Sequence, residues 1–286
     1  MKTKRKIAAL LAIVMAFSLS TGALAAEWSD FTDISGHWAE PTLQKGFSDE
    51  LITGYEDSTL RPDAPITGAQ MISVLCRVLG ATQAADISAL NLPADAWYAD
   101  AAGKALYLGL ISPKAGSLDA PMTRQNAFGM LAKAFCLTPA APDTSILNAY
   151  SDAKLLTPEN KPAMAALISA KLVTGYAGSL NANGSITRAE FITILYRIVE
   201  NYIASSALST VSAGGTVIAG SGGLGGVSLP YNVWFDCAAE SISLADVTLP
   251  TLTLRSHKLS SLSISGTTSI STLALALGSG SVTLNT

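Results

Sequence analysis

Two arginines stand at positions suited to binding an anion. Arg124 and Arg188 each follow a threonine, Thr123 and Thr187, that opens a run of apolar residues at helical spacing. A guanidinium group is a planar fork of N–H donors that can hold a carboxylate through two parallel hydrogen bonds. The unpaired backbone amides and the dipole at a helix N-terminus favour an anion at the same place. The sequence therefore predicts carboxylate-binding sites at two helix starts, and the alternative is a pair of solvated surface charges.

Aromatic and acidic side chains recur near these helices. Trp38 and Trp97 offer flat rings on which a sugar can stack, although a place in the core is an equally good interpretation. The carboxylates of Asp33 and Asp152 can accept sugar hydroxyls or hold an arginine in place. These residue types are suited to contact with a sugar.

Two glycines mark matching turns. Gly54 stands in the run L-I-T-G-Y and Gly175 in L-V-T-G-Y. Glycine adopts a positive φ with little strain, so we expect both to turn the chain, and a bare backbone there can also line a groove. His37, which precedes a tryptophan, is expected to form structural hydrogen bonds. Arg61, which precedes Pro62 and Asp63, is expected to fix a loop through an ion pair.

The chain repeats itself three times, each time as a predicted helix, loop and helix. The second helices begin at Thr67, Thr123 and Thr187, and in the first and third copies Gln70 and Glu190 complete capping boxes. Apolar residues then follow at helical spacing, which predicts a central bundle with one helix from each copy. The predicted core positions are Met71, Val74, Leu75, Val78, Leu79, Phe128, Leu131, Ala132, Phe135, Phe191, Ile194, Leu195, Ile198 and Val199.

The amino-acid composition changes after the third copy. Residues 204–240 are rich in glycine and serine and are expected to form a hinge, and residues 241–286 carry short apolar–small–apolar motifs at regular intervals. This pattern predicts strands of a β-solenoid or a compact meander, with a disordered stalk as the alternative. No polar cap follows, so we predict either a homo-oligomer formed through the C-terminal strands or a fragment of a longer molecule. The motifs begin at Ile242, Leu252, Leu262, Leu273 and Val282.

The N-terminus predicts export. Residues 1–25 combine four basic residues, an apolar run and Ala23-Leu24-Ala25, which together are typical of a cleaved secretory signal peptide. The apolar run is too short for a membrane anchor, so no membrane association is expected after cleavage. The formal net charge of −3 argues against nucleic acid. The three cysteines show no spacing typical of a disulfide framework.

The run D-I-S-G-H-W-A-E from Asp33, with L-I-T-G-Y, L-R-P-D and I-T-R-A-E-F further on, resembles the S-layer homology (SLH) domain. The resemblance covers residues 29–200 and divides them into repeats at 29–82, 92–138 and 148–203. It implies a pseudo-threefold bundle that binds secondary cell-wall polysaccharide, often pyruvylated, in grooves between repeats. The copies depart from the pattern, because Gly68 replaces the arginine of the first and the third lacks the tryptophan.

The fold class expected is therefore multidomain, with a mainly α-helical SLH triple repeat followed by a small all-β segment. The function expected is non-covalent anchoring of a secreted protein to the cell wall or S-layer, with one or two working grooves. The alternatives are a self-assembling surface-layer subunit and a fragment of a wall-tethered carbohydrate-active enzyme. We expect no catalytic residues, metal or cofactor, since none of the sequence motifs of those sites occurs. The candidate ligand-binding residues are Asp33, Trp38, Gly54, Trp97, Arg124, Asp152, Gly175 and Arg188.

Overall fold

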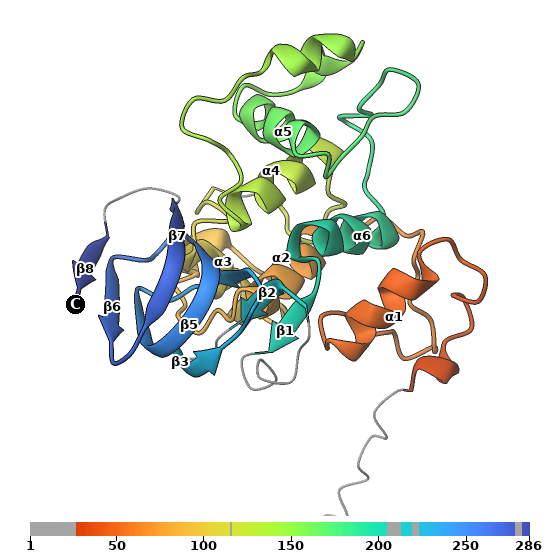
Figure 1. The fold of residues 1–286 in the computed structure, drawn as a ribbon. Coiled ribbons are helices and arrows are strands. Elements are labelled where there is room, and N and C mark those ends of the chain that lie inside the picture. The colour runs from red at the N-terminus through yellow and green to blue at the C-terminus, as the bar shows by residue number, and fades with distance from the viewer. Residues whose placement is uncertain (1–26, 115, 205–212, 219–222, 278–281) are drawn as a thin grey trace, which may run out of the picture.

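The chain folds into a helical unit followed by a β-solenoid that lies against it (Figure 1). The computed structural model describes residues 27–114, 116–204, 213–218, 223–277 and 282–286. The signal peptide expected at residues 1–25 lies outside this range. No helix in the described part of the chain is long and apolar enough to cross a bilayer.

The helical unit consists of three helix pairs joined by loops, and the second helix of each pair begins at a threonine cap. The hydroxyl oxygens of Thr67, Thr123 and Thr187 each accept the backbone N–H three residues ahead, as the sequence predicts. Short 3-10 turns occupy some of the connections. The helices are α1 (Glu40–Ser48), α2 (Gly68–Val78), α3 (Ala99–Tyr107), α4 (Arg124–Ala134), α5 (Asn160–Ser169) and α6 (Arg188–Val199).

The segments that precede α2, α4 and α6 hydrogen-bond to one another in a closed ring. The Ile66 N–H donates to the Ile186 carbonyl at 3.0 Å, Ile186 to Met122 at 3.1 Å, and Met122 back to Ile66 at 2.9 Å. Each bond joins two different helix pairs, so the ring gives the unit pseudo-threefold geometry. The middle helix pair donates one of these hydrogen bonds and accepts another, as the other two pairs do, although its sequence motif is the weakest.

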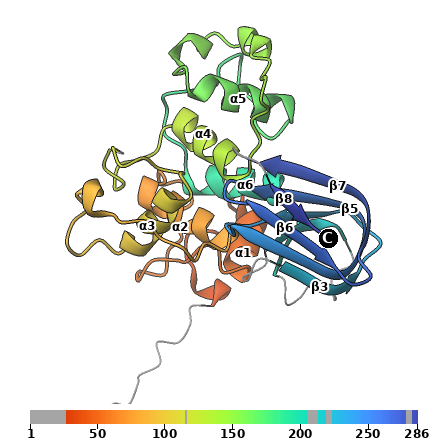
Figure 2. The same ribbon diagram turned by 90° about the vertical axis from the view of Figure 1, so that its left-hand side faces the viewer.

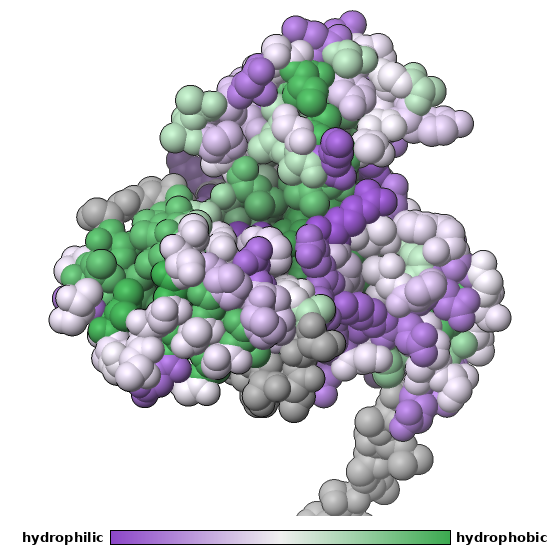
Figure 3. Space-filling model, in the orientation of Figure 1, coloured by the Kyte–Doolittle hydropathy of each residue, from purple (hydrophilic) through white to green (hydrophobic). Residues whose placement is uncertain are grey.

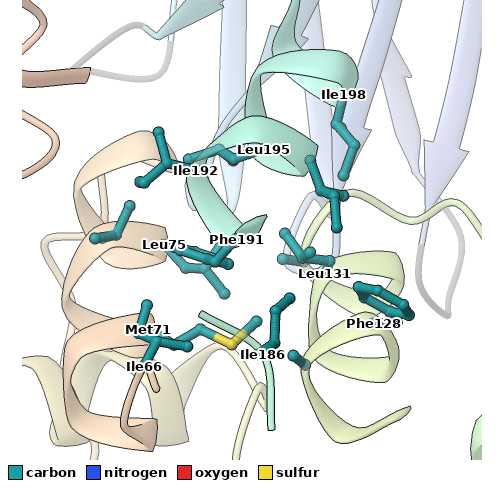
Figure 4. Close-up of a cluster of buried hydrophobic side chains, with 14 of the residues drawn as sticks. Ile66, Met71, Leu75, Phe128, Leu131, Ile186, Phe191, Ile192, Leu195 and Ile198 are labelled. Atoms are coloured by element: carbon teal, nitrogen blue, oxygen red, sulfur yellow. The ribbon is translucent and has the colours of Figure 1, made fainter. Parts of the chain in front are cut away.

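The three capped helices enclose the core, which confirms the central bundle predicted from the sequence (Figure 4). Phe128, Phe191, Met71, Leu75 and Leu131 are all essentially inaccessible to solvent. The first helix of each pair packs chiefly on the second helix of the preceding pair, because α3 lies against α2, α5 against α4 and α1 against α6. The grooves of the unit are therefore formed between repeats.

The C-terminal strands wind into a solenoid of about three turns, because all the strand pairs described are parallel (Figure 2). One row contains β1, β2, β4, the end of β5 and β7, and the other contains β3, the start of β5, β6 and β8. This confirms the solenoid and excludes a meander, whose neighbouring strands would be antiparallel. The strands are β1 (Tyr202–Ala204), β2 (Gly215–Ile218), β3 (Gly223–Ser228), β4 (Val233–Asp236), β5 (Ser241–Ser256), β6 (Ser261–Ser265), β7 (Ser269–Leu277) and β8 (Thr283–Asn285).

The prediction of a hinge at residues 204–240 is corrected by the structure. The described part of this range contributes β2, β3 and β4 to the solenoid. Its glycines serve close backbone approach between stacked strands. A Cβ atom at Gly215 would overlap the Asn201 carbonyl oxygen, and one at Gly223 would lie 2.8 Å from the Ser243 carbonyl oxygen. Glycine richness therefore marks tight stacking here.

The solenoid is joined to the helical unit by specific contacts. The Ala238 N–H donates to the Leu79 carbonyl at 3.0 Å, and the buried Arg255 guanidinium lies 5.5 Å from the centre of the Phe135 ring. The Tyr107 hydroxyl donates to the Glu240 carboxylate, which raises the pKa of the tyrosine. The two units therefore form a continuous body.

Candidate ligand-binding grooves between the repeats

The first groove is built around Arg188 at the start of α6. Its guanidinium crosses to the loop of the first repeat, where Nε donates to the Leu60 carbonyl at 2.9 Å and Nη2 to the Thr53 carbonyl at 3.3 Å. The charged group lies 5.2 Å from the centre of the Tyr55 ring. We call the space between this loop, α2 and α6 groove 1. Its lining residues are Leu43, Leu51, Ile52, Thr53, Ile66, Gln70, Ser73, Val74, Arg77, Trp97, Arg188 and Ile192.

Groove 1 continues past Trp97 into a second hollow. The inner hollow beside Arg188 has a volume of about 70 Å³, and the outer one has about 430 Å³. Trp97 and Arg77 line both, so the indole lies at the junction. The outer hollow also contains the ion pair between Lys104 Nζ and Asp100 Oδ2, whose atoms lie 2.6 Å apart.

The electrostatics of groove 1 favour an anion. Among the described residues, no carboxylate lies within ion-pair distance of Arg188. Burial lowers the pKa of its guanidinium, and the charge of Arg61 acts in the same direction. The group remains a cation, because arginine keeps its proton in proteins. A bound anion would relieve the cost of this partly desolvated charge.

Groove 3 contains the equivalent arginine, Arg124, at the start of α4. Its Nη1 lies 2.7 Å from Glu190 Oε1, and its Nε donates to the Leu180 carbonyl at 3.2 Å. Glu190 stands at the place that the uncharged Gln70 takes in groove 1, so the arginine of groove 3 already has a carboxylate partner. This hollow has a volume of about 350 Å³ and is lined by Arg124, Thr174, Gly175, Tyr176, Ser179, Leu180, Asn181 and Glu190.

Groove 2 has lost its arginine. Gly68 takes that position, and a Cβ atom there would lie 3.2 Å from the Leu118 carbonyl oxygen. This hollow is the largest, at about 940 Å³, and the solenoid residues His257 and Leu277 form part of its wall. The His257 Nε2 contacts the Lys133 carbonyl oxygen, so the histidine belongs to the contact between the two units.

Trp38 and Trp97 occupy the same place in two repeats, two residues before the start of α1 and α3. Their exposed fractions are 61% and 65%. The alternative of two core aromatics is therefore wrong, and both rings are accessible to a ligand.

Gly54 and Gly175 are needed for a different reason from the one predicted. Neither has a positive φ, in contrast to Gly109, which turns the chain at φ +70°. A Cβ atom at Gly54 would overlap the Phe31 ring, and one at Gly175 would lie 2.5 Å from Tyr150 Cε1 and from the Ser179 carbonyl oxygen. The aromatic residue at the start of each repeat thus sets the requirement for glycine in the loop.

The carboxylates of Asp33 and Asp152 hold the same loops through backbone amides. Asp33 accepts from Leu60 N at 2.9 Å and from Arg61 N at 2.7 Å. Asp152 accepts from the Leu180 and Ala182 amides, and although partial burial opposes the shift, these bonds lower its pKa. Their contact with sugar hydroxyls stays a prediction.

His37 and Arg61 have the structural roles expected of them. His37 Nε2 lies 3.2 Å from Asp63 Oδ1, and its Nδ1 accepts from the Ala39 amide at 3.1 Å. The Arg61 guanidinium pairs with Asp57 at 2.9 Å, within the loop.

A recurring cation was missed at the sequence level. Arg77, Lys133 and Arg197 each follow the cap threonine of their repeat at the same interval. Arg77 Nη1 donates to the Leu51 carbonyl and Arg197 Nη1 to the Leu172 carbonyl, both at 3.1 Å. Aligning the three repeats on their threonines would have revealed this position.

Comparison with known proteins agrees with this geometry. Residues 30–72 and 149–192 match the model of the S-layer homology domain, so the first and third helix pairs are similar to SLH domains. It is also 26% identical over 201 residues to the "Surface-layer 125 kDa protein" of Lysinibacillus sphaericus, a match that covers 68% of this chain and 17% of that protein. The chain therefore spans only a small part of this relative. Both likenesses support a cell-surface or S-layer location and a structural or anchoring role.

Proposed function

We propose that the helical unit anchors the chain to the cell wall by binding an anionic secondary cell-wall polysaccharide in groove 1. The observation that carries this proposal is the combination of a partly buried arginine without a carboxylate partner and an exposed tryptophan at the junction of two hollows. A carboxylate on the ligand would pair with the arginine, and the face of a sugar ring would stack on the indole.

The sizes of the two hollows suggest how the ligand lies. The inner hollow holds about 70 Å³, roughly half of the ~150 Å³ cavity that takes up a benzene ring, which suits a carboxylate substituent but not a sugar ring. The outer hollow holds about 430 Å³ and has room for a ring beside Trp97. We infer that a substituent such as a pyruvate ketal enters next to Arg188. The ring that carries it stacks on Trp97, and its hydroxyls face Asp100 and Lys104.

The proposal includes the middle helix pair as a third repeat and residues 1–25 as an export signal. The ring of hydrogen bonds through Met122 supports the first, and the sequence pattern alone supports the second. Groove 3 is the weaker candidate site, since Glu190 would have to release Arg124 before an anion could bind.

The test is co-sedimentation of the purified protein with wall sacculi, before and after the attached polysaccharide is removed. The decisive variants are Trp97→Ala and Trp38→Ala, because the two rings have similar exposure and matching positions in their repeats, and of the two only Trp97 lines groove 1. We expect Trp97→Ala to bind about tenfold more weakly, a change of about 1.4 kcal/mol, and Trp38→Ala to stay close to wild type. Arg188→Gln should also weaken binding.

Two outcomes would contradict the proposal. Equal binding to stripped sacculi would show that the attached polysaccharide is not the ligand. Normal binding by Trp97→Ala together with loss in Trp38→Ala would place the site beside Trp38 and not in groove 1. Circular dichroism of each variant checks that the fold is retained, which is expected because both rings lie mostly in solvent.

A further inference from the structure

The last residue of the capping box differs between groove 1 and groove 3, although it caps its helix in the same way in both. Gln70 Oε1 accepts from the Thr67 amide at 3.2 Å. Glu190 Oε2 accepts from the Thr187 amide at 2.9 Å. The second polar atom of each side chain is then left over. It is a hydrogen-bond donor in glutamine and an acceptor in glutamate, so the two residues suit different neighbours.

In groove 1 the leftover atom of Gln70 binds a tyrosine and not the arginine. Its Nε2 donates to the Tyr55 hydroxyl at 2.7 Å, and the Arg188 guanidinium lies 5.2 Å from the centre of the same ring. Gln70 and Arg188 line the same inner hollow. Because an amide nitrogen cannot accept from a guanidinium, this atom of Gln70 does not compete with a bound carboxylate for Arg188.

In groove 3 the leftover atom of Glu190 takes the arginine. Its Oε1 lies 2.7 Å from Arg124 Nη1, and the side chain of Arg124 is only 13% exposed. Tyr176 stands at the place of Tyr55 in its repeat, yet it is 89% exposed whereas Tyr55 is half-buried. A carboxylate ligand would have to displace Glu190 and would also be repelled by its charge.

Helix α6 is shared by the two grooves. Arg188 reaches from it to the loop of the first repeat, and Glu190 extends from it to Arg124. Hydrophilic side chains gather over this helix (Figure 3). We propose that the last residue of the capping box decides which groove binds an anion, and that groove 3 is a second site for the same class of ligand, held closed by Glu190. This inference rests on the proposed function, since both grooves would take a sugar that carries a carboxylate.

The test is isothermal titration calorimetry of the purified chain with a methyl glycoside that carries a pyruvate ketal. We expect one binding site per chain in the wild type and two in Glu190→Gln. The substitution keeps the helix cap, because Gln70 makes the equivalent contact in the first repeat. Glu50→Gln is the matched control and should keep one site, because Glu50 is exposed and is not among the residues that line grooves 1 and 3.

Two further variants test the same position in the opposite direction and in isolation. Gln70→Glu places a carboxylate beside Arg188 and should remove the site in groove 1. Arg188→Gln should remove it as well, and adding Glu190→Gln to Arg188→Gln should restore one site, now in groove 3. Loss of the ion pair with Arg124 can lower stability, but a merely structural role of Glu190 would not create a binding site.

The number of sites separates this proposal from the proposed function. One site in both the wild type and Glu190→Gln overturns the closing role of Glu190 and leaves binding in groove 1 intact. Two sites in the wild type also overturn it. No site in the wild type but one in Glu190→Gln supports the closing role and contradicts binding in groove 1. No site in either protein contradicts both.

Discussion

At the scale of single residues, the loops of the first and third repeats need a glycine, because a Cβ atom at Gly54 or Gly175 would overlap a neighbouring aromatic ring. Phe31 lies in a cluster with Trp28 and Phe47, whose ring centres are 5.9 and 5.3 Å from its own. Since the ring has neighbours on several sides, it has little freedom to move away from a Cβ atom at Gly54. The loop that carries Thr53 into groove 1 is thus positioned by the aromatic residue behind it.

We therefore expect Gly54→Ala to destabilise the protein by about 1–3 kcal/mol, as overpacking in a filled core does. Gly116→Ala is the matched control, because nothing lies within 4 Å of a Cβ atom there and its φ is not positive. The measurement is the free energy of unfolding from denaturant titrations. Equal stability of the two variants would show that Phe31 can move aside.

The sequence predicted the residues of the grooves better than their roles. The threonine caps and the arginines after them follow from local hydrogen-bond rules, which need only three or four neighbouring positions. The contact of Gly54 with Phe31, or of Glu190 with Arg124, joins residues far apart in the chain. No local pattern encodes such contacts, so the difference between grooves 1 and 3 emerged only from the structure.

At the scale of secondary-structure elements, the packing of α3 on α2 creates a buried thiol. Cys76 lies on α2 with Sγ 3.6 Å from the Ala101 carbonyl oxygen, and burial raises its pKa from 9.0 to about 12. Below pH 9 the thiol is protonated in both the folded and the unfolded chain, so it contributes its full stability. Between pH 9 and pH 12 only the unfolded chain loses the proton, so stability falls as pH rises.

Comparison of wild type with Cys76→Ala isolates this effect from the tyrosines that titrate in the same range. We expect the free energy of unfolding of the wild type to fall more steeply above pH 9, with the difference approaching on the order of 4 kcal/mol near pH 12. A thiol reagent at pH 8 should leave Cys76 unmodified in the folded protein. Parallel pH curves for the two proteins would refute the burial argument.

The helices of the core were predictable and the order of their packing was not. A helix-period stripe shows which face is buried, but not that α1 meets α6 and α3 meets α2. In the solenoid, the short motifs predicted strands at the right places. The glycine-rich stretch before them was misread as a hinge, because glycines such as Gly215 allow close backbone approach between stacked strands, which the pattern of side chains does not reveal.

At the scale of the whole molecule, the solenoid forms part of the wall of one of the three grooves. Groove 2 lacks both the arginine and the tryptophan, and the solenoid residues His257 and Leu277 form part of its wall. The contacts of Ala238 with Leu79 and of His257 with Lys133 join the helical unit and the solenoid into one mechanical body, in which a load on the solenoid passes to the helical unit.

A shared unfolding transition follows from this contact. Three tryptophans, Trp28, Trp38 and Trp97, lie in the helical unit and Trp234 lies in β4, so single-tryptophan variants report the two parts separately. We expect both probes to unfold at the same denaturant concentration in the otherwise unchanged protein. Tyr107→Phe removes the hydroxyl that donates to the Glu240 carboxylate across the contact.

Because a hydrogen bond to a charged group contributes about 1.5–3 kcal/mol, and Glu240 is itself exposed, the loss in Tyr107→Phe should lie at the lower end of that range. The Trp234 transition should then separate from the others or move with them to lower denaturant. Tyr176→Phe is the matched control, since Tyr176 is 89% exposed and its loss of a hydroxyl should change neither midpoint. If the two probes already separate in the wild type, the solenoid folds independently and transmits no load through this contact.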